Sequence, residues 1–451
     1  MDLYIRLTYK EHLEETTFQL SEGRDGKLYL IPMSEEGITS LNDRIQVRKL
    51  SDGGLILDDI LRFKEDEQVI RNRMSGLAEA YLDAKSQGFE VTSEETGGEP
   101  KPGYNPDDIY VENKPFSIRQ IIELIEQGDL DLAPNFQRHF IWDRTRQSLL
   151  IESILLGLPL PSIYLSQYPD GMLTVVDGLQ RIHTIKNFMD NKLRLCNLEY
   201  LRECNGKTYE EVKNVLSSLR IRRFGQTQLM CFVIDYRSPN KLKYDLFRRL
   251  NTGGKPLNGQ EIRNCLSRSA VQDALNEMSQ SKEFKMATDN TVTNTRLQAQ
   301  EAALRFLYFR RQYSASNPVG DYTGKMDDTL NEFVDVLNMQ QDFTQEVELF
   351  KESMRSAYYL FGKEAFRKIN TQGARRLAVN KLLMLCLSVL LSFHKFDEIK
   401  SRYQAGSWVE PLKTLIETNE DFYRAITYGT NAKWNVETAM TILRDELVNN
   451  N

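Results

Sequence analysis

The chain has 451 residues, of which 41% are hydrophobic and 27% charged, and its formal net charge is −6 at pH 7. These values predict a globular protein of two or three domains, and they exclude a polycation that binds nucleic acid along its whole length. The five cysteines lack Cys-x-x-Cys spacing, which argues against a disulfide framework or a cysteine zinc site. The cysteine pattern, together with an N-terminus that does not resemble a signal peptide, favours a cytoplasmic location without membrane contact.

Composition divides the chain into four segments. Alternating apolar residues predict strands in a small α+β accessory domain at 1–90. This domain is expected to be either a recognition domain or a structural cap. Low hydrophobicity with Pro and Gly predicts a linker at 91–114. We expect a mixed core at 115–270 and an all-helical domain at 271–451, so the predicted fold class is α+β.

Polar motifs predict where several helices begin. Ser117-Ile-Arg-Gln120 and Thr208-Tyr-Glu-Glu211 have the spacing of capping boxes, and Asn258 begins a further helix. Asp143 is expected to cap a helix that runs to Leu156, with Leu158 still facing inward. The longest apolar run is 382–391, about half a membrane span, so it predicts a buried helix.

An arginine lies among aromatic residues in the segment Pro134-Asn-Phe-Gln-Arg-His-Phe-Ile-Trp-Asp143. Arg138 has the planar fork that suits a phosphate, while Phe136 or Trp142 would shape a pocket beside it. The alternative is a cation–π or packing cluster at a domain edge, and composition alone favours that alternative.

The central stretch of the chain changes period at an Asp-Gly pair. Residues 173–176 form a short apolar run that predicts a buried strand, and apolar residues at helical spacing follow from Leu179. Gly178 permits an unusual backbone dihedral or the close approach of a ligand. The helix start with Asp177, Gln180 and Arg181 offers N–H groups, a carboxylate, an amide and a guanidinium, which are components of a nucleotide site. For this string alone, a plain strand–turn–helix with a capping Asp and a surface Arg is about as well supported as a nucleotide site.

Two further places carry candidate phosphate contacts. Arg220, Arg222 and Arg223 form a basic cluster before a strand at 228–235, and they indicate either a solvated face or contact with DNA phosphates. Asn251 and Gly254, in the sequence Phe247-Arg-Arg-Leu-Asn-Thr-Gly-Gly-Lys-Pro-Leu257, suit a helix C-cap or a loop around a nucleotide.

Two structural details can also be predicted from the residue pattern. Residues 193–198 read as another strand. In the helical region, Glu301 and Arg305 are spaced for an i, i+4 ion pair.

Four segments, taken together and in this order, resemble the N-terminal domain of GmrSD-type modification-dependent (type IV) restriction enzymes, whose motif is written DGQQR. The resemblance covers roughly 115–310. It implies a fold similar to the ParB and sulfiredoxin nucleotide-binding domains, in a stand-alone form with a helical remainder. The segments are Asn135-Phe-Gln-Arg-His-Phe-Ile-Trp-Asp, Ile154-Leu-Leu-Gly-Leu-Pro-Leu-Pro, Val176-Asp-Gly-Leu-Gln-Arg and Phe247-Arg-Arg-Leu-Asn-Thr-Gly-Gly-Lys-Pro-Leu.

In that family the domain is associated with nucleoside-triphosphate binding and hydrolysis that regulate DNA cleavage in phage defence. The resemblance therefore implies Mg²⁺ with a nucleoside triphosphate of unknown base. Asp177, Gln180 and Arg181 take the catalytic positions, with Asp177 also the metal ligand. The implied nucleotide-binding residues are Arg138, Trp142, Gly178, Asn251 and Gly254, and the DNA-binding residues are Arg222 and Arg223.

The sequence departs from the family pattern in two ways. Leu179 replaces the first Gln of the motif, which puts hydrolysis in question if that Gln positions water and changes nothing if it only packs. Only four histidines are present and none lies in an HNH-like string, so we expect a nuclease to be a separate protein. For His139 and His183, packing or hydrogen bonding is favoured over a metal role.

Three hypotheses follow, in this order. The first is a nucleotide-hydrolysing regulatory component of a DNA restriction or phage-defence system, with a separate nuclease or effector as partner. The second is a nucleotide-gated DNA-binding or adaptor protein without turnover. The third is a ParB-like DNA nuclease, which the acidic net charge disfavours. Oligomeric state is open under all three.

Overall fold

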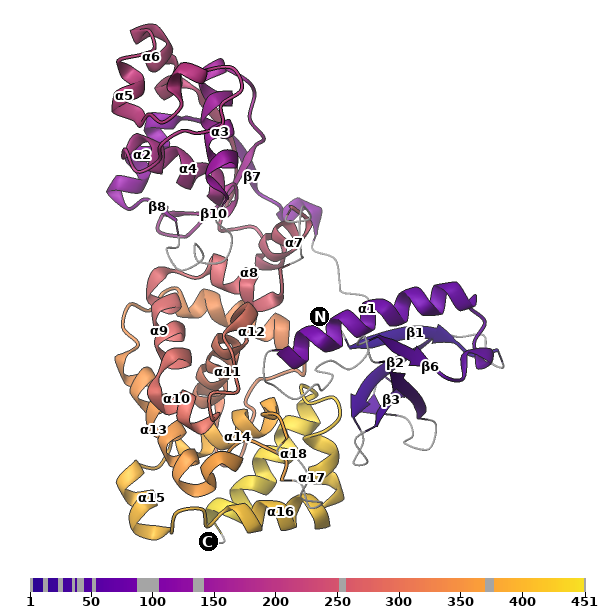
Figure 1. Ribbon diagram of the computed structural model, residues 1–451. Helices are drawn as coiled ribbons and strands as arrows, with labels where there is room; N and C mark the ends of the chain where they lie inside the picture. The colour runs from indigo at the N-terminus through magenta and orange to yellow at the C-terminus, as the bar shows by residue number, and fades with distance from the viewer. Residues whose placement is uncertain are drawn as a thin grey trace. The chain divides into compact units, whose positions relative to one another are not determined.

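The protein is mixed α+β, with a small N-terminal sheet and a helical C-terminal region, which confirms the predicted fold class (Figure 1). A likeness to ParB and sulfiredoxin domains stays a prediction. Contacts divide the chain into two compact units: Pro102–Asp273 with Val334–Gln341, and Met1–Lys101 with Ala274–Phe333 and Asp342–Asn451. The computed structural model describes residues 3–10, 15–22, 27–34, 37–38, 44–50, 54–86, 105–132, 142–250, 257–369 and 377–449.

An antiparallel sheet forms the N-terminal part of the chain, as its alternating apolar residues predict. The strand order is β1-β2-β3-β5-β6, and β4 pairs with β3. Apolar side chains of the sheet and of helix α1 (Glu67–Ser86) share one buried cluster, so the helix covers one face of the sheet. The strands are β1 (Tyr4–Thr8), β2 (Glu15–Glu22), β3 (Leu28–Ser34), β4 (Gly37–Ile38), β5 (Ile45–Lys49) and β6 (Leu55–Leu57).

A second sheet, of five strands, carries the central stretch of the sequence. Its order is β7-β11-β9-β10-β8. β7 with β11 and β9 with β10 are antiparallel, while β9 with β11 and β8 with β10 are parallel. The strands are β7 (Val111–Ser117), β8 (Leu130–Asp131), β9 (Ile163–Gln167), β10 (Leu173–Asp177) and β11 (Gln228–Ile234).

Helices cover both faces of this second sheet. Val175 belongs to one hydrophobic cluster and Val176 to another, because neighbouring residues of β10 point to opposite faces. The first cluster includes residues of α2 (Ile118–Gln127), α3 (Arg144–Leu156), α4 (Leu179–Met189), α5 (Tyr209–Lys213) and α6 (Ser218–Gln226). The second includes residues of α7 (Asn240–Leu250) and α8 (Gly259–Leu266).

Local polar motifs fix the starts of several of these helices as predicted. The Ser117 N–H donates to Gln120 Oε1 at 2.8 Å and the Gln120 N–H donates back to Ser117 Oγ at 3.3 Å. Capping boxes are also present at Thr208 and Asn258. The Asp143 carboxylate caps α3 by accepting the Arg146 N–H at 2.8 Å.

Two details of the sequence prediction are wrong. Residues 193–198 contain no strand, and their position is held by tertiary hydrogen bonds such as Leu195 N–H to Lys207 O at 3.0 Å. Leu158 does not face inward, since it is 50% exposed beyond the C-cap of α3. Glu152 of α3 is buried instead, although the spacing of apolar residues does not predict burial at this position.

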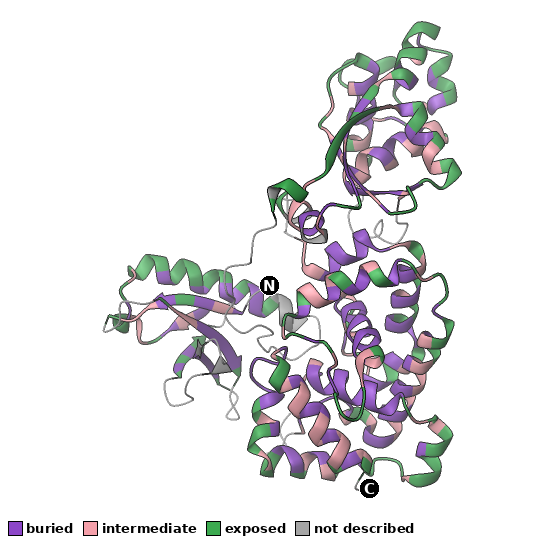
Figure 2. Cartoon of the chain, turned by 180° about the vertical axis from the view of Figure 1, so that it is seen from behind, coloured by how far each residue is buried: buried purple, intermediate pink, exposed green. Residues whose placement is uncertain are grey.

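The rest of the described chain is helical, and Figure 2 shows buried residues along the inner sides of these helices. Leu382–Leu391 of α14 is buried throughout, as predicted, and no described helix is both long and apolar enough to cross a membrane. The helices are α9 (Ser269–Gln280), α10 (Lys282–Ala287), α11 (Gln298–Gln312), α12 (Met326–Leu337), α13 (Thr344–Phe361), α14 (Lys381–Leu391), α15 (Phe396–Arg402), α16 (Val409–Thr418), α17 (Glu420–Ala425) and α18 (Lys433–Leu443).

Candidate functional site

The Asp-Gly pair joins a strand to a helix, as the sequence predicts. β10 ends at Asp177, and Gly178 is the N-cap of α4 with a left-handed φ of 102°. Gly178 has no side chain to cap the helix, so the N–H groups of the first turn of α4 receive no cap of that kind. This end of the helix carries the positive part of its dipole and suits an anion.

Gly178 also lies in a crowded place. A Cβ at this position would meet Ile163 Cγ1 at 3.0 Å and Arg181 Nη2 at 3.2 Å. Contacts of this length force a neighbour to move, so the glycine is required both for its dihedral and for the space beside it. The absence of a side chain lets the Arg181 guanidinium lie against the turn.

Arg181 is tied to the same turn that it follows. Its Nη2 lies 2.7 Å from Asp177 Oδ2, and its Nη1 donates to the carbonyl oxygen of Pro161. The Arg181 side chain is 11% exposed and that of Asp177 is 30% exposed. Asp177 Oδ1 accepts no hydrogen bond within the part of the chain that the structure describes, so one carboxylate oxygen is available to a ligand.

Gln180 holds the backbone of Trp142. Gln180 Oε1 accepts the Trp142 N–H at 3.3 Å, and Gln147 Nε2 donates to the Trp142 carbonyl at 2.6 Å. The indole ring packs against the core, and the Arg146 guanidinium carbon lies 4.6 Å from its ring centre. The two glutamines therefore hold one backbone segment from α4 and from α3, a connection that the sequence does not reveal.

The neighbouring positions on α4 have structural contacts. Leu179 is partly buried and packs against the hydrophobic core of this unit. His183 Nδ1 lies 3.1 Å from Asn187 Nδ2, which agrees with the favoured hydrogen-bonding role. Burial lowers the pKa of His183, and Lys192 and Lys186 lower it further. A neutral ring that accepts from Asn187 follows from these conditions.

Several predicted site residues lie elsewhere or cannot be placed. Arg138, Asn251 and Gly254, with His139, lie outside the described residues. Arg222 and Arg223 are exposed on α6, and their guanidinium groups have no ion pair with any residue that the structure describes.

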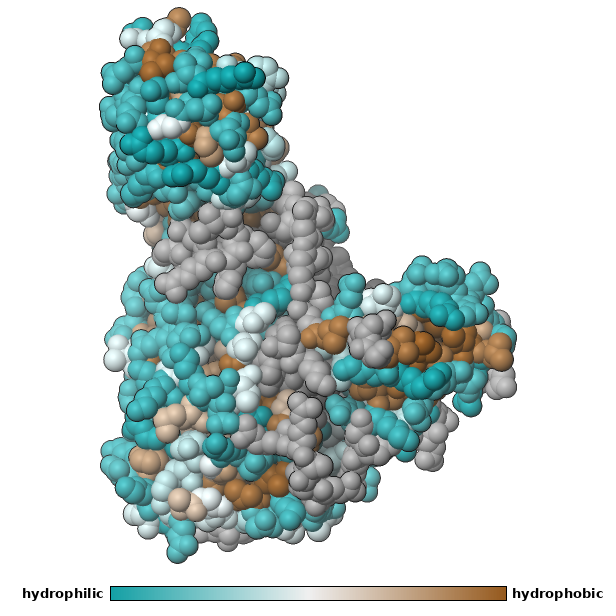
Figure 3. Space-filling model, viewed as in Figure 1, coloured by the Kyte–Doolittle hydropathy of each residue, from teal (hydrophilic) through white to brown (hydrophobic). Residues whose placement is uncertain are grey.

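The surface and the acidic groups give little further indication of a site. Figure 3 shows a mostly hydrophilic face on the unit that contains α6, with small separate apolar patches. Among the described residues, no group of three or more His, Cys, Asp or Glu side chains is placed to hold a metal. A site for Mg²⁺ in this unit would therefore rest on few protein ligands, as is common when phosphates and water supply the others.

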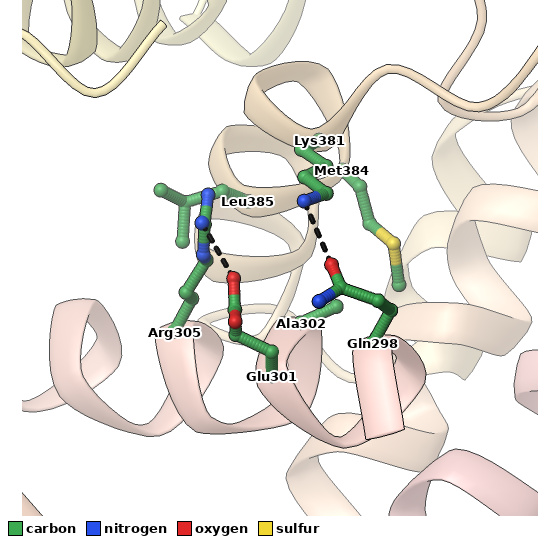
Figure 4. Close-up of a pocket in the computed structure, with 7 residues that line it drawn as sticks. All are labelled: Gln298, Glu301, Ala302, Arg305, Lys381, Met384 and Leu385. Atoms are coloured by element: carbon green, nitrogen blue, oxygen red, sulfur yellow. Dashed lines mark hydrogen bonds and ion pairs between the residues drawn. The ribbon is translucent and has the colours of Figure 1, made fainter. Parts of the chain in front are cut away.

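A cavity in the helical region is too small to be a nucleotide site. It lies between α11 and α14 beside the buried Glu301–Arg305 ion pair, which has an N–O distance of 2.6 Å and confirms the predicted i, i+4 pair (Figure 4). Lys381 Nζ donates to Gln298 Oε1 at 2.8 Å on its other side. The volume of this cavity, about 10 Å³, leaves room for about one water molecule and is far too small for a nucleotide.

The fold and the site together define a mixed α+β domain that presents an Asp-Gly turn between a strand and a helix. Residues 118–267 match the family model described as "GmrSD restriction endonuclease, N-terminal domain". This part of the chain therefore belongs to that domain family, as the four sequence segments indicated, and the family indicates a component of a restriction or phage-defence system. No curated protein matches the chain.

Proposed function

We propose that the turn at Asp177 and Gly178 binds a nucleoside triphosphate with Mg²⁺, and that this binding regulates DNA restriction. The observation that carries the proposal is the partly exposed Asp177 carboxylate directly before the start of α4, whose Oδ1 accepts no hydrogen bond from the residues that the structure describes. Mg²⁺ is bound by one or two carboxylates together with phosphate oxygens and water, so a single carboxylate beside a phosphate-binding helix start fits this ion.

Each residue of the turn has a distinct proposed role. Asp177 Oδ1 would hold Mg²⁺, which when bound neutralises phosphate charge. Arg181 orients the Asp177 carboxylate through Oδ2, and its cationic charge attracts phosphate to the turn. Gly178 contributes no side chain that could cap the first N–H groups of α4, which leaves these groups to the ligand.

Hydrolysis is the first hypothesis and binding without turnover the second. Leu179 packs against the core, so the side chain at this motif position faces the interior of the domain. That orientation favours a packing role for the position and supports turnover despite the missing Gln. The third hypothesis, a nuclease, is the least supported, because the net charge of −6 disfavours a protein that binds and cuts DNA by itself.

The proposed partners are DNA and a separate nuclease or effector. Arg222 and Arg223 are exposed and unpaired within the described chain, and guanidinium groups in that state bind phosphates of the DNA backbone. In this proposal the nucleotide state of the Asp177 turn controls whether bound DNA is passed to the nuclease.

The test is calorimetric binding of each nucleoside triphosphate with Mg²⁺, with phosphate release measured on the same samples. Asp177→Asn removes the metal-binding charge and is expected to weaken Mg²⁺-dependent binding at least tenfold and to abolish release. A suitable control is Asp190→Asn, because Asp190 pairs with Lys186 at 3.0 Å on the same helix with the same i, i+4 spacing. Binding without release in the wild type would favour the gated adaptor. Equal effects of the two substitutions would refute the assignment of the turn.

A further inference from the structure

The peptide of Trp142 is held by hydrogen bonds from two helices. Gln180, in the first turn of α4, accepts its N–H, and Gln147, in the first turns of α3, donates to its carbonyl. Trp142 directly precedes the cap of α3 at Asp143. These two bonds therefore connect the start of α3 to the start of α4, where Asp177 and Gly178 lie.

The chemistry of the two bonds fixes the orientation of both amides. A backbone N–H can only donate, so the Gln180 atom facing Trp142 is its oxygen. A backbone carbonyl can only accept, so the Gln147 atom facing Trp142 is its NH₂ group. The two glutamines thus use opposite halves of the same functional group on the two backbone groups of one residue.

We propose that Gln180 acts as a positioning residue, holding the Trp142 peptide against the first turn of α4, and that it does not contact the nucleotide. The site at Asp177 then depends on Gln180 through the placement of α3 relative to α4. This inference rests on the proposed nucleotide site for its functional consequence, while the Trp142 contact itself can be measured without any nucleotide.

The opposite polarity of the two amides gives a discriminating pair of substitutions. Gln180→Glu keeps an acceptor oxygen for the Trp142 N–H, so the contact survives. Gln147→Glu loses the donor and places a carboxylate against the Trp142 carbonyl, so the contact fails. If Gln180 instead donated its NH₂ group to a phosphate or to the attacking water, Gln180→Glu would be the more damaging change because it sets a negative charge against phosphate.

The experiment measures two quantities on the full chain, namely hydrogen exchange of the peptide containing Trp142 without nucleotide and the affinity for Mg²⁺–triphosphate by calorimetry. Gln180→Leu, of similar volume, is expected to speed exchange at Trp142 and to weaken binding about two- to tenfold, the range of one lost hydrogen bond. Gln180→Glu is expected to keep exchange at Trp142 within about twofold of the wild type, because an acceptor oxygen remains for the Trp142 N–H. Gln147→Glu is expected to resemble Gln180→Leu. Gln226→Glu, on the exposed surface of α6, controls for the added charge.

The outcomes separate the two proposals. Unchanged exchange at Trp142 in Gln180→Leu would overturn the positioning role. So would exchange at Trp142 that is as fast in Gln180→Glu as in Gln180→Leu, because the acceptor oxygen would then make no difference to this contact. A wild type that binds no nucleotide would refute the proposed function, and the exchange of Trp142 would still decide whether Gln180 holds this peptide. Thermal unfolding of each variant verifies that the domain remains folded.

Discussion

At the scale of single residues, Gly178 meets two requirements at one position, a left-handed backbone dihedral and a lack of space for a side chain. Its φ of 102° is unfavourable for any side chain, and the space where a Cβ would lie is already bounded by Ile163 and Arg181. Gly128 offers a useful comparison, because its φ is 82° and a Cβ there would meet nothing within 4 Å. The pair separates the cost of the dihedral from the cost of the crowding.

We predict that Gly178→Ala lowers the free energy of unfolding by about 1 kcal/mol more than Gly128→Ala does, because only the first substitution adds crowding to the dihedral cost of about 1–2 kcal/mol. Denaturant unfolding of both variants measures the difference. The added methyl group also displaces the Arg181 guanidinium, so nucleotide affinity is expected to fall in Gly178→Ala alone. Equal stability losses in the two variants would show that the contacts with Ile163 and Arg181 relax without cost.

The site could be predicted from the sequence only as far as its contacts are local. Asp177, Gly178 and Arg181 lie within one turn, so strand, turn and ion-pair spacing are all visible in a short string. Trp142 was predicted as a wall of the pocket, and its sequence gives no sign that its peptide is held by Gln180, because that bond joins residues far apart in the chain.

At the scale of elements, the division between contacts that are local in the sequence and contacts between distant residues explains which predictions were right. Capping boxes such as Ser117 with Gln120 involve residues three positions apart, and the sequence predicts them correctly. The predicted strand at 193–198 is absent, and the segment that follows it is held by Glu152, a residue of α3. The Glu152 carboxylate accepts the N–H groups of Glu199, Tyr200 and Leu201 at 3.1, 2.8 and 2.7 Å.

We predict that Glu152→Gln lowers the free energy of unfolding by about 2 kcal/mol, because its NH₂ group would face a backbone N–H and leave it without an acceptor. Thermal or denaturant unfolding measures the loss, and hydrogen exchange of 199–201 localises it. Glu126→Gln, an exposed change on α2 of the same domain, is the matched control and is expected to stay within about 0.5 kcal/mol of the wild type. Unaltered exchange at 199–201 would contradict this account.

At the scale of the whole molecule, the unit that carries the site is not one continuous segment. The family match ends at residue 267, yet Val334–Gln341 belongs to the same compact unit. Asn338 explains why, because its Oδ1 accepts the Arg268 N–H at 2.8 Å and its Nδ2 donates to the Leu266 carbonyl at 3.0 Å. The same Leu266 carbonyl accepts the hydroxyl of Tyr168, which follows strand β9, so Asn338 supports the hairpin that ends at Asp177.

We predict that Asn338→Ala lowers the stability of this unit by about 2 kcal/mol, because it removes two hydrogen bonds at a buried position and leaves the Arg268 N–H without an acceptor. Hydrogen exchange followed by mass spectrometry resolves the two units separately, and faster exchange is expected in peptides of α8 and β10. Met339→Ala, at the next position and 66% exposed, is the matched control. It is expected to change neither the stability of the unit nor the exchange in α8 and β10. If Asn338→Ala left exchange in α8 and β10 unchanged, the segment 334–341 would lie next to the domain without contributing to its stability. Faster exchange confined to α8 would mean that the support ends at Leu266 and does not reach the turn at Asp177.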